Sequence, residues 1–71
     1  MNILVVGMFP QINKIRISCN RNMLPRIKLL DGVENVRQSR TFAWLYEVNI
    51  CSTENIDEVR ARLEGLNREH A

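Results

Sequence analysis

Alternating apolar and polar residues predict two half-buried β-strands, at residues 14–19 and 42–50. In each strand every second side chain is apolar, so one face suits a core and the other suits solvent. The apolar set of the second strand comprises Phe42, Trp44, Tyr46, Val48 and Ile50. Burial of a large side chain is worth roughly 1.5–3 kcal/mol, so we expect these aromatic residues, Trp44 included, to pack in the core against the last helix.

Two further strands complete the predicted sheet. Residues 3–9 form a continuous apolar run, which is typical of a strand covered on both faces. Residues 10–13 contain proline and asparagine and predict a hairpin turn to the next strand. Residues 33–41 predict an irregular, more polar strand that is connected tightly to the aromatic strand.

Apolar residues spaced three and four apart predict two amphipathic helices. The first is short, is capped by Asn20 or Asn22, and ends at Gly32, because glycine accepts the left-handed backbone that follows many helices. The second follows Ser52 or Thr53 as its cap. Its buried stripe comprises Ile56, Val59, Leu63 and Leu66. Residues 67–71 are expected to fray.

The predicted order β-β-α-β-β-α defines the fold class of a single domain, residues 1–71. A ferredoxin-like domain has the order β-α-β-β-α-β, and moving its last strand to the amino terminus produces the order predicted here. We therefore expect a circularly permuted, ferredoxin-like α+β fold, a two-layer sandwich with a four-stranded antiparallel sheet and two helices on one face. The apolar first strand would then lie at a sheet edge, which predicts a homodimer through residues 3–6.

Positive charge is concentrated in the first part of the chain. The net charge is +2, but residues 1–30 carry five basic residues and no acid, whereas residues 31–71 carry five arginines and eight acids. Such asymmetry indicates an acidic partner, either a protein face or a nucleic acid. We predict that binding to that partner uses Lys14, Arg16, Arg21, Arg26, Lys28, Arg37 and Arg40.

One segment is similar to a known motif. Residues 40–45, Arg-Thr-Phe-Ala-Trp-Leu, resemble part of the aromatic strand of the RNA recognition motif, with Thr41 in place of its glycine. The resemblance implies stacking of RNA bases on Phe42 and Trp44. Strand parity favours a different interpretation, because exposing that face would place Glu47 and Asn49 in the core at a cost in free energy.

Catalytic and metal-binding chemistry finds little support in the sequence. His70 is the only histidine and lies in the predicted tail, while Cys19 and Cys51 lack the spacing of a zinc or redox pair. We expect both cysteines to be buried, reduced, small apolar side chains. No cofactor is predicted. The apolar run at residues 3–6 is too short to span a bilayer, which predicts a cytoplasmic protein.

These observations favour a small, non-enzymatic protein-interaction module, such as an adaptor, regulator or inhibitor. Its predicted binding surface is the open face of the sheet, where Lys14 and Arg16 would lie beside Leu45, Glu47 and Asn49. The alternative is an RNA-binding module that uses the basic amino-terminal half of the chain.

Overall fold

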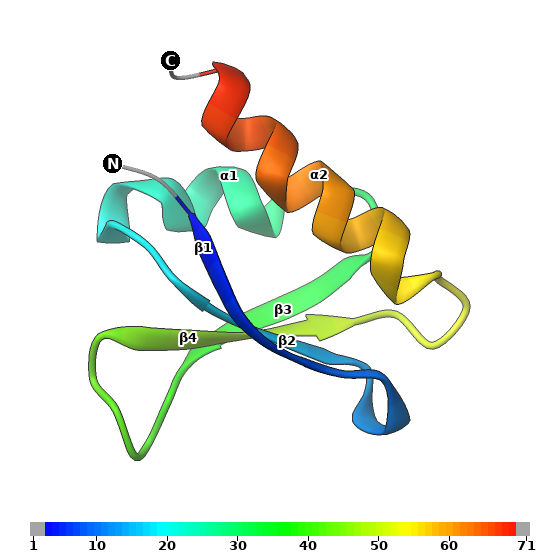
Figure 1. Ribbon diagram of the computed structural model, residues 1–71, viewed down its shortest axis with the longest axis horizontal. Coiled ribbons are helices and arrows are strands. Elements are labelled where there is room, and N and C mark those ends of the chain that lie inside the picture. The colour runs from blue at the N-terminus through cyan, green and yellow to red at the C-terminus, as the bar shows by residue number, and fades with distance from the viewer. Residues whose placement is uncertain (1–2, 70–71) are drawn as a thin grey trace.

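In the computed structural model, which describes residues 3–69, strands and helices follow one another in the predicted order. The strands are β1 (Leu4–Phe9), β2 (Lys14–Ser18), β3 (Val33–Gln38) and β4 (Leu45–Ile50). The helices are α1 (Leu24–Lys28) and α2 (Ile56–Glu69), and the short 3-10 turns η1 (Pro10–Ile12) and η2 (Arg21–Met23) precede β2 and α1. Both helices lie on the same side of the sheet (Figure 1).

The strands form one antiparallel sheet in the order β1-β2-β4-β3, which confirms the predicted α+β fold. A ferredoxin-like sheet with its last strand moved to the amino terminus would have the same strand order. The description of the fold as a circularly permuted ferredoxin-like domain stays a prediction. β1 is an edge strand, as expected. The register shifts between Val5 and Gly7 in β1 and between Val33 and Asn35 in β3. Irregularities of this kind bend an edge strand and make it a poorer template for further pairing.

The core lies between the sheet and the helices. Its fully buried side chains come from the two central strands and both helices, namely Ile15, Ile17, Ile27, Val48, Val59 and Leu63. Within β4 the predicted alternation is confirmed, because Tyr46, Val48 and Ile50 are buried and the residues between them are half-buried.

The prediction that Trp44 packs in the core is wrong. β4 begins at Leu45, so Phe42 and Trp44 precede the strand and lie in the loop that joins β3 to β4. Their side chains are 38% and 64% exposed. Leu45 pairs with Ser18, the last residue of β2, and the residues before Leu45 therefore have no neighbour on the central strand to extend the sheet.

The first helical segment follows the prediction closely. The side chain of Asn20 caps η2 by accepting a hydrogen bond from the backbone of Asn22, at 3.0 Å. Met23 and Ile27 face the core. Gly32 has a φ of +89° in the turn before β3, which is the left-handed backbone expected of it.

Helix α2 differs from the prediction at both ends. Its cap is Asn55 rather than Ser52 or Thr53, because the Asn55 side chain accepts hydrogen bonds from the backbone N–H groups of Asp57 and Glu58. A turn in which the N–H of Glu54 donates to the carbonyl of Cys51 comes first and delays the start of the helix.

The predicted fraying from residue 67 is contradicted at Asn67. The Asn67 amide accepts from the N–H of Ile3 at 2.7 Å and donates to the carbonyl of Ile3 at 2.9 Å, which fastens α2 to the start of the sheet edge. Residues 70 and 71 lie outside the described residues.

Both cysteines are unpaired and half-buried. Cys19 packs against the core, and burial raises the pKa of its thiol. Cys51 lies just beyond the end of β4. Over the described residues, no helix is both long and apolar enough to cross a membrane.

Candidate interaction surface

The face of the sheet opposite the helices displays the polar side chains of β2 and β4. Arg16 is paired in register with Glu47, and Lys14 is paired with Asn49. Their strand neighbours Ile15, Ile17 and Val48 point the other way, into the core. The predicted open face is therefore present, and its position follows from strand parity.

Glu47 is the electrostatic centre of this face. Its two carboxylate oxygens lie 3.2 Å from Nζ of Lys14 and 3.3 Å from Nη2 of Arg16. The hydrogen bond from Lys14 is the main cause of a lowered pKa for the Glu47 carboxyl, with help from Arg16 and against the opposing effect of partial burial. One carboxylate thus holds two cations, and the trio keeps a net positive charge.

Phe9 extends this group toward the sheet edge. Its ring centroid lies 5.3 Å from Cζ of Arg16, within the range of a cation–π interaction. Gly7, which is paired with Arg16, makes room for the ring, because a Cβ at Gly7 would lie 3.1 Å from a ring carbon of Phe9. The missing side chain at Gly7 thereby sets the position of an exposed aromatic ring on the open face.

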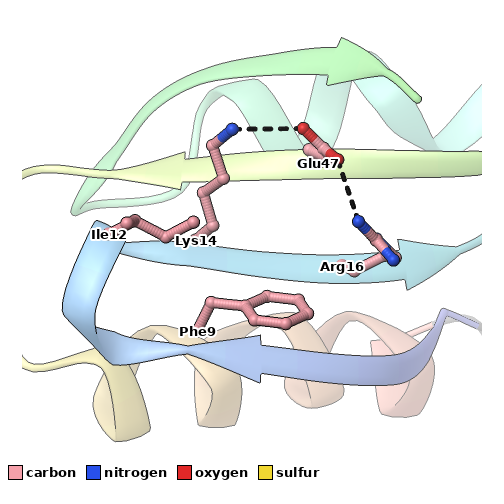
Figure 2. A pocket seen from close by; sticks show the side chains of 5 residues that line it. All are labelled: Phe9, Ile12, Lys14, Arg16 and Glu47. Carbon is pink, nitrogen blue, oxygen red and sulfur yellow. Dashed lines mark hydrogen bonds and ion pairs between the residues drawn. The ribbon is translucent and has the colours of Figure 1, made fainter. Parts of the chain in front are cut away.

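A pocket of about 190 Å³ lies among Phe9, Ile12, Lys14, Arg16 and Glu47, and is called the Phe9 pocket below. Figure 2 shows Lys14 and Arg16 approaching Glu47 from two sides, with Phe9 beside Arg16. Ile12 is 60% exposed, and Phe9 is 37% exposed. The pocket is therefore lined by both apolar and charged side chains.

A second depression, of about 310 Å³, lies where the open face meets the loop between β3 and β4, and is called the loop hollow. Its charged lining residues are Lys14, Arg37, Arg40 and Glu47, and the rest of its lining is polar. Arg37 is paired with Glu47 in the β3–β4 register, which brings a third strand into the basic surface. The lining of the hollow holds three cations and one carboxylate.

The structure divides the seven predicted partner-binding residues between two layers. Four of them line the Phe9 pocket or the loop hollow on the open face, namely Lys14, Arg16, Arg37 and Arg40. The other three belong to the helical layer and are exposed there, namely Arg21, Arg26 and Lys28. A surface that uses all seven would have to reach both layers, so the structure does not bring the seven together on one face.

Sequence reasoning missed the exposed apolar part of the surface. Phe9 and Ile12 were grouped with a buried strand and a turn, and Phe42 and Trp44 were placed in the core. A usable signal was present in the polar run Ser39-Arg40-Thr41, which suits a loop better than the interior of a strand.

Within residues 3–69, no group of three histidine, cysteine or acidic side chains is placed to hold a metal ion. No family model matches the chain, and no curated protein or solved structure is similar enough to identify a relative.

Proposed function

We propose that this protein is a small binding module whose open sheet face docks an acidic protein partner. The observation that carries the proposal is the Phe9 pocket, where exposed Phe9 and Ile12 adjoin two cations that share one carboxylate. Aromatic and arginine side chains are enriched among the residues that dominate binding energy in protein interfaces. A partner's carboxylate would meet the excess positive charge, while its apolar side chains would cover Phe9 and Ile12.

The charge arrangement favours specificity and fast association more than tight binding. The ion pairs of Glu47 are partly exposed, and such pairs contribute modestly to stability, so Lys14 and Arg16 remain available to a second anion. Nε of Arg16 is buried without a hydrogen-bond partner among the described residues. A buried donor left unsatisfied is costly, and a partner's oxygen that reached this N–H would remove that cost.

The edge of the sheet offers a second, apolar contact. Leu4 and Val6 on β1 are 62% and 46% exposed. An edge strand with exposed apolar side chains can pair with a strand of a partner or of a second copy of the chain. A homodimer through this edge stays part of the proposal, with the register shift after Val5 limiting how far pairing can extend.

The proposed module acts by binding and not by catalysis. Its proposed location is the cytoplasm, where the unpaired Cys19 and Cys51 would stay reduced.

Affinity capture from nuclease-treated extract of the source cell tests the proposal. The key variant is Lys14→Gln/Arg16→Gln, and glutamine is chosen because two new acids beside Glu47 would destabilise the face. The matched control, Arg21→Gln/Lys28→Gln, removes the same charge from the helical layer. We expect one protein to be retained by the unmodified chain and by the control, and lost from the key variant. Equal retention by all three, or loss of the protein on nuclease treatment, would refute the proposal.

A further inference from the structure

The loop between β3 and β4 holds two aromatic rings outside the core. Trp44 is 64% exposed and Phe42 is 38% exposed. Their ring centroids lie 5.3 Å apart with the planes tilted by 52°, so each ring's main aromatic neighbour is the other. In Figure 1 the loop projects from the sheet on the side away from the helices. The fold makes little use of these rings for its own stability.

Hydrogen bonds hold the loop in one conformation. The buried side chain of Ser39 accepts from the backbone N–H groups of Thr41 and Phe42, both at 3.2 Å. The Ser39 N–H donates to the carbonyl of Leu45 at 2.9 Å, and the Leu45 N–H donates to the carbonyl of Phe42 at 3.0 Å. The side chain of Gln38 donates to the carbonyl of Ala43 at 2.6 Å.

This restraint affects binding. A ligand that contacts the rings does not have to order the loop first, and the entropic cost of binding is correspondingly smaller. Trp44 and Phe42 are therefore displayed in advance of any partner.

Cations lie at the base of the same loop. Arg40 belongs to the loop, and with Arg37 and Lys14 it lines the loop hollow. The one acid in that lining, Glu47, is already paired with Lys14 and Arg16. An anion that enters the hollow would meet a net positive charge and polar side chains.

We propose that this loop binds single-stranded nucleic acid, with a base stacked on Trp44 and the adjoining phosphates held by Arg37 and Arg40. Exposed aromatic rings beside a basic groove are what single-strand recognition requires, because every base has a face that can stack and every nucleotide carries a phosphate. The hollow at the base of the loop is lined by charged and polar side chains, which suit phosphates better than the apolar side chains of a protein. The site uses a loop instead of the central strands, and it does not rest on the function proposed above.

Trp44 provides a direct assay, because it is the only tryptophan in the chain. The probe is an oligo(dT) of about ten nucleotides, which suits the usual site sizes for single strands. We expect the oligonucleotide to quench the fluorescence of Trp44, since stacking places a base against the indole. Binding should weaken with added salt, and Arg37→Gln/Arg40→Gln should lower the salt slope by about 1.4, at roughly 0.7 for each lost phosphate contact. The control Arg21→Gln/Lys28→Gln should leave the slope unchanged.

A labelled oligonucleotide measures the contribution of the ring itself. Trp44→Ala should weaken binding by about 5- to 150-fold, and Trp44→Phe should restore most of the loss. Both substitutions are at an exposed position, and far-UV circular dichroism verifies that the variants are folded.

Four results would overturn the proposal. The first is the absence of quenching up to roughly 0.5 mM oligonucleotide, a concentration above the weak limit of non-specific binding. The second is an unchanged affinity in Trp44→Ala, and the third is equally strong competition by poly-glutamate, which would indicate a general anion site. The fourth is a blue shift of Trp44 fluorescence with anionic phospholipid vesicles in place of the oligonucleotide, which would indicate a membrane contact.

Discussion

Replacement of glycine by alanine should have opposite effects on stability at positions 32 and 65. Gly32 has a φ of +89° in the turn before β3, and its carbonyl accepts a hydrogen bond from the Cys51 N–H at 2.9 Å. A Cβ there would lie 2.9 Å from Cγ2 of buried Val59 and 2.8 Å from Oε1 of Glu54. A Cβ at Gly65, within α2, would have no atom within 4 Å apart from its chain neighbours and the backbone of its own helix.

The cost of Gly32→Ala has two parts. Left-handed backbone costs an L-residue about 1–2 kcal/mol relative to glycine. The contact with Val59 adds an overpacking cost of about 1–2 kcal/mol, because that side chain is fully buried and cannot swing away. The Glu54 carboxylate can move, although it would give up its 3.2 Å ion pair with Arg62. We expect a total loss of about 2–4 kcal/mol in the free energy of unfolding.

Gly65→Ala is the matched control and should stabilise the protein. Glycine inside a helix is about 0.8–1 kcal/mol less favourable than alanine, and the open space at this position removes any steric penalty. In a domain of this size each kcal/mol moves Tm by about 4–8 °C. Gly65→Ala should therefore raise Tm by roughly 4–8 °C, and Gly32→Ala should lower it by roughly 8–30 °C.

Urea unfolding followed by circular dichroism measures both differences. If the free energy of unfolding of Gly32→Ala lay within about 0.5 kcal/mol of that of the unmodified chain, the turn would be able to adopt a negative φ at little cost. The left-handed backbone of Gly32 would then not be required for stability. A loss of stability in Gly65→Ala would show that the outer face of α2 is covered.

The remaining predictions concern five other positions. Asn67→Ala should lower the free energy of unfolding, measured in urea titrations, by about 1–3 kcal/mol, because it leaves the backbone N–H and carbonyl of Ile3 without partners. A loss below about 0.5 kcal/mol would mean that water replaces the Asn67 amide. The pKa of Glu47 is lowered on folding, so its contribution to stability is present above the unfolded pKa and is lost as pH falls through the folded one. Glu47→Gln should therefore flatten the acid side of the stability–pH curve, below about pH 5. If β1 mediates a homodimer, Leu4→Lys should convert it to a monomer in light scattering, and a monomeric unmodified chain at micromolar concentration would dismiss that dimer. Trp44→Ala should lower the free energy of unfolding by less than about 1 kcal/mol, whereas Tyr46→Ala, at a side chain only 7% exposed, should lower it by about 3–5 kcal/mol. Equal losses in the two variants would mean that the indole of Trp44 is packed against the protein.

Periodicity was sufficient to predict the order of elements and the inward faces of the central strands. Ile15 and Ile17 on β2, and Val48 on β4, alternate with polar residues, and parity forces each set to one side of the sheet. The positions of Lys14 and Arg16 on the open face follow from the same parity.

Strand ends and caps depend on contacts that periodicity does not contain. The alternation of residues 42–50 continues through Trp44, but β2 ends at Ser18 and leaves nothing for the earlier residues to pair with. Ser52, Thr53 and Asn55 are all suitable caps, and the turn closed by the Glu54 N–H decides in favour of Asn55. The predicted binding residues were grouped by charge along the chain, whereas the fold places Arg21 in the helical layer and Arg37 on the open face of the sheet.

The exposure of Trp44 changes the functional inference as well as the fold. Burial of the aromatic residues was the reason to prefer a protein partner over a nucleic acid, and for Phe42 and Trp44 that reason no longer holds. The central strands β2 and β4 still carry no aromatic ring on the open face, where Arg16 and Glu47 lie opposite each other, so a base would find no ring to stack on there. The two sites therefore suit different ligands. The Phe9 pocket suits a protein that brings apolar side chains, and the loop that contains Arg40 suits a nucleic acid that brings bases and phosphates. Because Lys14 lines both depressions, two such ligands would compete for it, and an oligonucleotide that displaced a captured protein partner would show that the two sites are coupled.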